Sequence, residues 1–255
     1  MRTLLICHEE DRLNRIGLAS WLASFSELSG VVVLRETRER KQKRVRREIK
    51  RVGWLRILDV LAFRLFYRFS FAARDLGWEK SELEKLCARY GQPRAAELIQ
   101  PTPNTAASEQ FIRDAKPDLI VARCKTLLAE RIFTLARVGT FVMHPGICPE
   151  YRNAHGCFWA VAAGDLEHVG MTLLKIDKGV DTGPVYGYFH VRPQPQQSHI
   201  VLQHRSVFEN LDAIRASLER IASGQGTSID TSGRRSGEWG QPWMTRYFAW
   251  KRGLD

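Results

Sequence analysis

One histidine and one aspartate stand out, because each follows a short apolar run and lies in a loop of turn-forming residues. The run Thr140–Met143 ends at His144, and the run Val169–Ile176 leads into the loop that carries Asp181, 37 positions after the histidine. A carboxylate beside an imidazole favours the protonated ring, and histidine titrates near neutral pH. Because ligands of open α/β sheets bind at strand ends, we expect both side chains at the carboxyl edge of a sheet, within hydrogen-bond reach or one water apart.

The sequence between these two residues resembles the catalytic part of the folate-dependent formyltransferases. That family includes methionyl-tRNA, glycinamide ribonucleotide and nucleotide-sugar formyltransferases. Its pattern is Asn-x-His, a Pro/Ser-rich loop, an aromatic-Arg-Gly turn, a helix, and an Asp in a Leu/Val-Asp-x-Gly loop. Here the histidine is His144, the turn is YRN at 151–153, and the aspartate loop is VDTG at 180–183. The resemblance extends over roughly Gln110 to Tyr188.

This resemblance implies transfer of a formyl group from 10-formyltetrahydrofolate to an amine. It implies that His144 stabilises the oxyanion and transfers a proton, and that Asp181 orients and charges the imidazole. The position of the family's asparagine, two before the histidine, is Val142, which cannot donate a hydrogen bond. Three alternatives follow: a transferase that uses another donor, with Asn153 as one candidate; a catalytically impaired protein with the same fold that binds a ligand or a membrane; or a formyltetrahydrofolate hydrolase that uses water as acceptor.

The pterin pocket is also implied by the resemblance, through two loops. The first follows the strand before the histidine strand, and the second precedes the aspartate. In this sequence the cofactor-binding residues are Thr126, Leu127, Leu128, Lys178, Gly179 and Val180. A metal is not expected, since the histidines lack ligand spacing and the five cysteines form no CxxC pair.

The elements that position these residues are those of an α/β fold. TLLIC at 3–7 and VVVL at 31–34 read as buried strands around an amphipathic helix at about 14–25. With the resemblance, this predicts a Rossmann-like formyltransferase domain whose mostly parallel twisted sheet is flanked by helices. We predict this domain over 1–200, including a basic and apolar helical insertion at about 38–90. Residues 201–255 are predicted to form a helical C-terminal extension with an aromatic cluster.

The insertion begins with a strongly basic segment, since Arg35–Arg56 holds eleven basic and three acidic residues. Apolar residues at 54, 58, 61, 65 and 69 then share one face of a helix. Three interpretations are open. The helices pack on the body or on the second subunit of a homodimer with a solvated basic face, or they lie on an anionic membrane surface, or they bind RNA phosphates.

A small amine-bearing substrate is the expected acceptor. The methionyl-tRNA enzymes carry a further C-terminal β-domain, and the residues after Val191 are too few and too helix-like for one, so nucleic acid is not the expected partner. The N-terminal apolar run is too short for a signal peptide, and no stretch of about 18 apolar residues predicts a membrane span. We therefore expect a cytoplasmic protein, peripheral at the inner membrane face if the insertion binds lipid.

Overall fold

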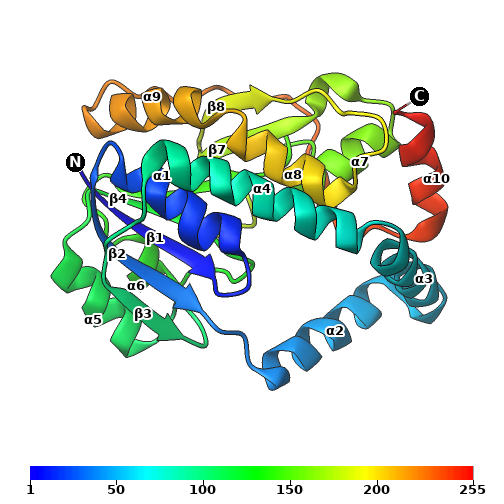
Figure 1. Ribbon diagram of the computed structural model, residues 1–255, viewed down its shortest axis with the longest axis horizontal. Helices are drawn as coiled ribbons and strands as arrows, with labels where there is room; N and C mark the ends of the chain where they lie inside the picture. Colours follow the sequence, from blue (N-terminus) through cyan, green and yellow to red (C-terminus); the bar gives the residue numbers. More distant parts are fainter. Residues whose placement is uncertain (255) are drawn as a thin grey trace.

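The computed structural model describes residues 1–254, in which seven strands form a sheet in the order β3-β2-β1-β4-β5-β7-β8 (Figure 1). The first five strands of that order are parallel, whereas β7 is antiparallel to β5 and β8 is antiparallel to β7. The predicted mostly parallel α/β sheet is thus confirmed. The strands are β1 (Arg2–His8), β2 (Glu27–Leu34), β3 (Glu97–Gln100), β4 (Leu119–Arg123), β5 (Gly139–His144), β7 (Gly170–Lys175) and β8 (Val185–His190).

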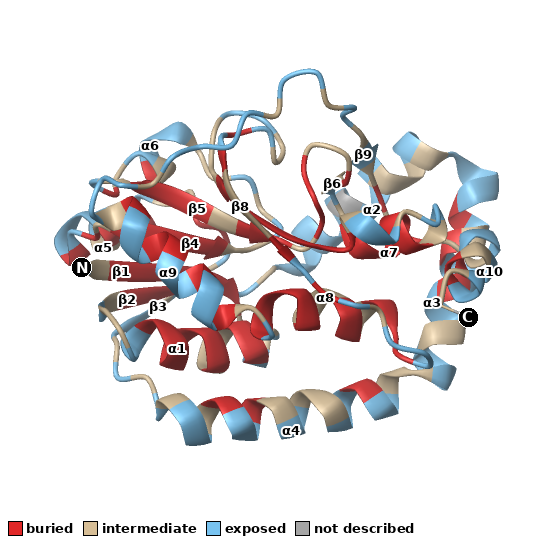
Figure 2. Cartoon of the chain, turned by 90° about the horizontal axis from the view of Figure 1, so that it is seen from above, coloured by how far each residue is buried: buried red, intermediate tan, exposed pale blue. Residues whose placement is uncertain are grey.

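Helices cover both faces of the sheet because successive strand residues point to opposite sides. In β1, Leu5 and Cys7 belong to the larger core, and Leu4 and Ile6 to the smaller one. Figure 2 shows the resulting buried interior between the helical layers. The larger core is closed by a π-helical turn η1 (Leu13–Leu18), α1 (Ala19–Ala23), α4 (Ala72–Tyr90), α8 (His199–Phe208) and α9 (Leu211–Ala222). The smaller core is closed by α5 (Ala106–Ala115) and α6 (Glu130–Phe133).

The helical character predicted for residues 38–90 is confirmed, and it is divided among α2 (Arg38–Val52), α3 (Trp54–Ser70) and α4. Thr37 caps α2 by accepting a hydrogen bond from the Arg40 amide, and Gly53 separates α2 from α3 with a positive φ of 81°. The three helices differ in their packing. Leu83 and Leu86 place α4 in the larger core, whereas α2 buries none of its described side chains fully.

A second apolar cluster lies beyond the carboxyl edge of the sheet, where α3, α7 (Gly156–Ala162) and α10 (Met244–Arg252) meet. Phe63 of α3 contacts Phe158 of α7 and Tyr247 of α10, with ring centroids 5.8 and 5.3 Å apart. The predicted aromatic packing of the last helix is therefore confirmed, although Phe248 stays exposed. Three short elements complete the fold: β6 (Arg152–Asn153), β9 (Glu238–Trp239), which pairs with β6, and the 3-10 turn η2 (Leu166–His168).

Among the described residues, we find no helix with both the length and the apolar character that crossing a bilayer requires.

Candidate functional site

The predicted contact between the histidine and the aspartate is present. His144 Nδ1 lies 3.3 Å from Asp181 Oδ2, and the two side chains are 5% and 15% exposed. The other ring nitrogen, Nε2, lies 2.8 Å from the Tyr151 carbonyl oxygen. Both neighbours are hydrogen-bond acceptors, and only the protonated imidazole donates from both nitrogens. The arrangement therefore suits a positively charged ring held in a fixed plane.

The expectation that both residues lie at strand ends on one edge of the sheet is wrong. The strand β7 runs antiparallel to β5, and its last residue, Lys175, is opposite Phe141. The loop at 176–184 instead returns toward His144 before Val185 begins β8. Gly183 fits this return because a Cβ there would lie 1.8 Å from the Lys175 carbonyl oxygen.

The loop after His144 is folded tightly around the imidazole. A Cβ at Gly146 would lie 2.4 Å from the Tyr151 carbonyl oxygen and 2.8 Å from His144 Nε2. Gly156, at the start of α7, is equally constrained, since its Cβ would lie 2.5 Å from the Gly146 Cα. The tyrosine carbonyl can reach the ring only because both positions lack a side chain. The sequence does not predict this carbonyl contact, because a main-chain atom leaves no residue-type signal.

Asp181 is held in an uncommon conformation by residues of β6. Its φ is +51°, a left-handed region that aspartate tolerates better than most residues. The Asn153 amide donates to Asp181 Oδ2 over 2.9 Å, and Arg152 Nη1 donates to the Val180 carbonyl over 2.8 Å. The Asn153 side chain points elsewhere, since its Nδ2 donates to the Trp239 carbonyl over 2.7 Å. The main chain of Asn153, rather than its side-chain amide, therefore serves the site.

Val142 lies on the same strand as His144, in an apolar setting. It packs against a small cluster that contains Cys148, Leu174 and Val185. Burial, and then the charge of Asp181, raise the pKa of the Cys148 thiol far above its usual range, so that this thiol stays neutral and is a poor nucleophile. No side-chain donor thus stands at the position where the resemblance expects an amide.

Thr172 supports this region, and the sequence analysis did not single it out. It is the one uncharged polar side chain in the apolar run of β7. It is opposite His144 in the sheet and fully buried. Its hydroxyl donates to the Gly146 carbonyl over 2.7 Å and accepts from the Cys148 amide over 2.9 Å. Thr172 therefore fixes the start of the loop that closes over the imidazole.

The two loops predicted to contact a pterin lie close together. Lys178 Nζ of the second loop lies 3.0 Å from Glu130 Oε2, just after the first loop. Leu127 is 62% exposed and offers uncovered apolar surface, whereas Leu128 packs against the smaller core. Gly179 is shaped by its own turn, where its amide donates to Asp177 Oδ1 over 2.9 Å. An uncovered leucine beside exposed main chain fits a flat heterocycle, and binding by these residues stays a prediction.

A group of histidines beyond the site is kept neutral by burial. Burial, then the positive charge of Lys125, lower the pKa of His155 to about 4. Burial, then His155, lower the pKa of His199 well below its usual value. The two rings lie 5.4 Å apart, and Gln203 Nε2 donates to His155 Nδ1 over 3.0 Å. These rings join α7 to α8.

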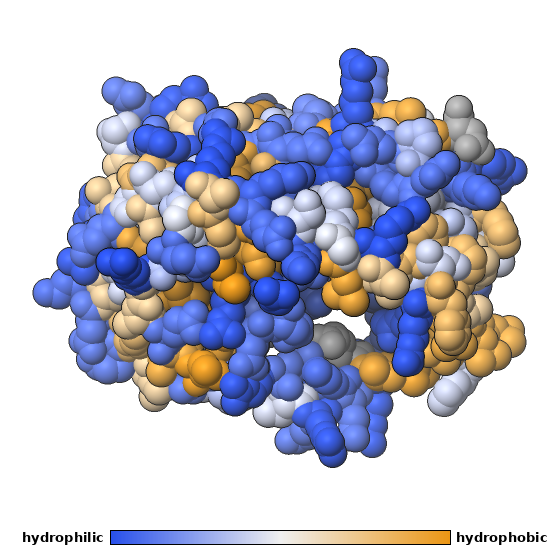
Figure 3. All heavy atoms as spheres, in the orientation of Figure 1, coloured by the Kyte–Doolittle hydropathy of each residue, from blue (hydrophilic) through white to orange (hydrophobic). Residues whose placement is uncertain are grey.

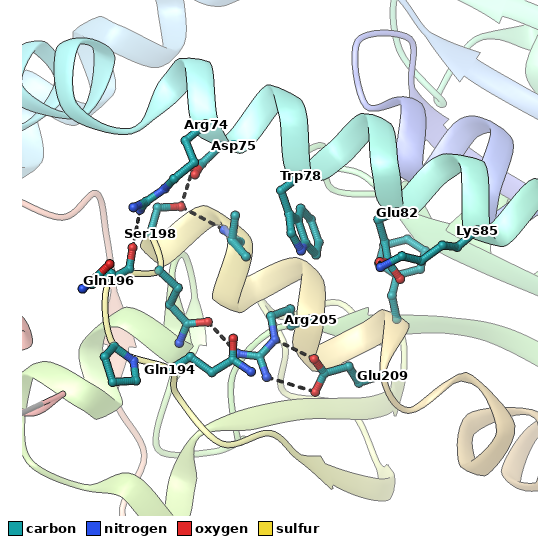
Figure 4. A pocket seen from close by; sticks show the side chains of 14 residues that line it. Arg74, Asp75, Trp78, Glu82, Lys85, Gln194, Gln196, Ser198, Arg205 and Glu209 are labelled. Carbon is teal, nitrogen blue, oxygen red and sulfur yellow. Dashed lines mark hydrogen bonds and ion pairs between the residues drawn. The ribbon is translucent and has the colours of Figure 1, made fainter.

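A cavity of about 460 Å³ lies elsewhere, between α4 and the segment 194–209 (Figure 4). It contains none of the predicted site residues. Asp75 at its wall accepts hydrogen bonds from the hydroxyls of Tyr67 and Ser198. Ser198 in turn caps α8 by accepting from the Val201 amide over 3.1 Å. The network joins the α3–α4 junction to α8, and it is structural rather than catalytic in character.

Comparisons with known proteins find similar sequences over about half of the chain. The model of the family described as formyl transferase matches residues 77–217, more than half of the chain. A methionyl-tRNA formyltransferase of Dehalococcoides mccartyi (strain CBDB1) is 29% identical over 161 residues, which cover 54% of this chain and 51% of that protein. A second, from Rhizobium meliloti (strain 1021), is 36% identical over 114 residues, which cover 44% and 35%. The chain thus spans about half the length, or less, of these curated relatives.

Two solved structures share the fold over nearly all of the chain. The phosphoribosylglycinamide formyltransferase of Anaplasma phagocytophilum has a TM-score of 0.56 and 15% identity, with 92% of this chain and 97% of that chain covered. A sugar N-formyltransferase from Shewanella sp. FDAARGOS_354 also has a TM-score of 0.56, with 10% identity and coverage of 100% and 87%.

Proposed function

Because the chain belongs to the formyl transferase family, we propose that it transfers a formyl group from 10-formyltetrahydrofolate to the amino group of a small molecule. The observation that carries this proposal is the His144–Asp181 contact of 3.3 Å, with the imidazole fixed on its other side by the Tyr151 carbonyl. Acyl transfer to an amine needs a hydrogen-bond donor for the developing oxyanion and a route for a proton. A protonated imidazole next to a carboxylate supplies both.

In this reaction the amine nitrogen bonds to the formyl carbon, and the bond from that carbon to N10 of the folate breaks. The amine loses a proton and N10 gains one. His144 can relay it, because the protonated ring gives a proton to N10 and the neutral ring then accepts one from the amine. We assign His144 Nδ1–H to the oxyanion, because its contact with Asp181 is longer than the roughly 2.7–2.9 Å usual between charged groups. The longer contact allows Nδ1–H to be shared with a second oxygen. Asp181 orients the ring through Nδ1, and the Tyr151 carbonyl fixes its plane through Nε2.

Val142 predicts a slow transferase. Loss of one oxyanion donor typically lowers the rate by about 10²–10³. The Val142 side chain packs against Leu174 and Val185, and this apolar cluster supplies no side-chain donor in its place. Such a reduction leaves a catalysed reaction, since the charged imidazole remains. The formyl donor is held, in this proposal, by Thr126, Leu127 and Leu128 on one side and by Lys178, Gly179 and Val180 on the other.

For the acceptor we propose a small amine that carries an anionic group. The wall beside Asp181 is built by β6 and β9, whose Arg152 and Glu238 lie in register. The chain carries a formal charge of +11, which attracts anionic molecules. Nucleotide-linked amino sugars and phosphorylated amines combine an amine with such a group. The similarity in fold to a sugar N-formyltransferase supports this class.

The experiment is an assay of tetrahydrofolate release from 10-formyltetrahydrofolate. The protein is supplied with a nucleotide-linked amino sugar, with glycinamide ribonucleotide, with methionyl-tRNA, or with no amine. Release that depends on a small amine, together with a formylated product, supports the proposal. Release with methionyl-tRNA alone overturns the acceptor class, and no release with any amine overturns the activity.

A second candidate is hydrolysis of the donor with water as acceptor. The same imidazole and carboxylate can catalyse it without a site for an amine. Hydrolysis predicts the same rate of tetrahydrofolate release with and without each amine, and formate as the product. The no-amine arm of the assay separates the two reactions.

A further inference from the structure

The helix α3 carries an apolar stripe that is largely exposed in the described chain. Five residues at intervals of three or four lie on one helical face. Their exposed fractions are 74% for Trp54, 63% for Leu58, 45% for Leu61, 56% for Leu65 and 82% for Phe69. Adjacent Leu55, 88% exposed, widens the stripe at its start. Monomeric proteins rarely expose so continuous an apolar surface without a use for it.

The stripe is held outward by the packing of the opposite face of α3. Ile57, Val60 and Phe63 are buried there, and Phe63 lies among the rings of Phe158, His199 and Tyr247. Asp59 adds a second anchor by accepting from the Thr245 hydroxyl over 2.7 Å and from its amide over 3.1 Å. Rotating α3 to hide the stripe would expose these residues. The helices α3 and α4 thus pack on the body, as one interpretation expected, but the face of α3 predicted to do so is wrong.

Positive charge surrounds the stripe. The preceding helix α2 holds nine basic and two acidic residues over 38–52, and its acids are paired within the helix, as Glu39 with Lys43 and Glu48 with Arg51. Arg64 and Arg68 of α3 are exposed beside the stripe. Figure 3 shows the apolar surface over α3 next to the hydrophilic surface of α2. An apolar face bordered by cations is the composition of helices that lie in the interface of a bilayer.

We propose that α2 and α3 together dock this protein onto an anionic lipid surface, with the stripe between the headgroups and the cations against lipid phosphates. This site is independent of the formyl-transfer proposal. A second copy is a poorer occupant, because a symmetric contact through α3 would bring Arg64, Arg68 and the α2 cations of both copies together. RNA phosphates would satisfy α2 and leave the leucines of α3 uncovered. The docking is peripheral, since α3 is too short and too charged to cross a bilayer.

The test is co-sedimentation of the full chain with vesicles of phosphatidylcholine alone, and of phosphatidylcholine mixed with phosphatidylglycerol. We expect binding to the mixed vesicles only, and weaker binding as salt is raised, because exposed charges are screened over about 8 Å at physiological ionic strength. Absence of binding to anionic vesicles at low salt overturns the proposal.

Point variants identify the surface. Leu58→Glu and Leu65→Glu each remove a leucine from the stripe, and each should weaken vesicle binding by about tenfold or more. The matched control is Ile229→Glu, which changes another exposed apolar residue, 41% exposed. Ile229 lies next to β8, at one edge of the sheet, whereas β2, which leads into α2, lies near the other edge. Circular dichroism should be unchanged in all three variants, because these side chains are exposed. Equal loss in the control, or none in the stripe variants, overturns the assignment.

Two further readouts distinguish other occupants. If light scattering shows that Leu58→Glu converts a dimer to a monomer, and the protein binds no vesicles, the stripe contacts a second copy. If the protein binds tRNA but no vesicles, α2 binds nucleic acid. Formyl transfer measured without vesicles should be equal in Leu58→Glu and the unchanged protein, so that loss of activity and loss of docking stay distinguishable.

Discussion

The loop around His144 and the helices α2 and α3 are built in opposite ways. At His144, a buried ring contacts a main-chain carbonyl seven residues away and a carboxylate 37 residues away, and glycines permit the approach. Along α2 and the outer side of α3, large side chains project into solvent. The first arrangement fixes atoms for chemistry, and the second leaves a surface uncovered. Changes in one region should therefore leave the property of the other unchanged.

The largest expected effect is the loss of formyl transfer in His144→Ala. An oxyanion donor and a proton-transfer group each contribute about 10²–10⁴ in rate, so we expect a decrease of at least about 10³ in kcat. Tetrahydrofolate release measures it, and circular dichroism checks that the fold is retained. Leu58→Glu, on the α3 stripe, is the control and should keep full activity. An active His144→Ala protein would remove the imidazole from the mechanism.

A smaller effect, in the opposite direction, is expected for Val142→Asn. An amide restored at this position gives the oxyanion a second donor, and we expect formyl transfer to rise by about 10². Val142→Ala, which removes packing against Leu174 and Val185 without adding a donor, is the matched control. If both variants leave the rate unchanged in an active protein, another group already stabilises the oxyanion.

His144 and Asp181 show how far the sequence alone predicts the site. The types and order of His144 and Asp181 indicated their contact correctly, because side-chain chemistry at fixed intervals carries a family's pattern. The path of the chain was misjudged, since the apolar runs of β5 and β7 look alike whether the strands are parallel or antiparallel. The Tyr151 carbonyl and the Asn153 amide were not foreseen, because every residue has such main-chain groups.

The fold was more predictable than the environment of its surface. Buried strands are continuous apolar runs and helices have a 3.6-residue period, so the sheet and the helices at 38–90 followed from the sequence. The spacing of the apolar residues at 54, 58, 61, 65 and 69 correctly predicted that they share one helical face. It did not predict that this face is exposed. A second set at Ile57, Val60 and Phe63 is the one that packs on the body. When one helix has two apolar faces, tertiary contacts decide which of the two is buried.

The acid sensitivity of folding should originate in the buried region and not in the exposed one. His155 has a pKa of about 4 in the folded protein and about 6.5 when unfolded, so the unfolded state binds more protons between these values. Stability is therefore full above pH 6.5 and falls as the pH decreases toward 4. At pH 5 the loss from this one group is about 2 kcal/mol. Denaturant unfolding of His155→Asn, which also suits its left-handed φ of 57°, should show a weaker decline between pH 7 and 5.

The smallest effect tests the exposed region directly. Leu65→Glu should change the free energy of unfolding by no more than about 0.5 kcal/mol, because a side chain that is 56% exposed contributes little to folding. Phe63→Ala, two residues earlier on the same helix, should cost roughly 3–5 kcal/mol, since it removes a buried ring from the cluster with Phe158 and Tyr247. Urea denaturation of the two variants compares the two faces of α3 within one turn.

A large destabilisation by Leu65→Glu would mean that the stripe is already covered in solution, as by a second copy of the chain. In that case the free energy of unfolding would also depend on protein concentration. An effect confined to Phe63→Ala would instead establish that folding leaves the outer face of α3 free for a partner.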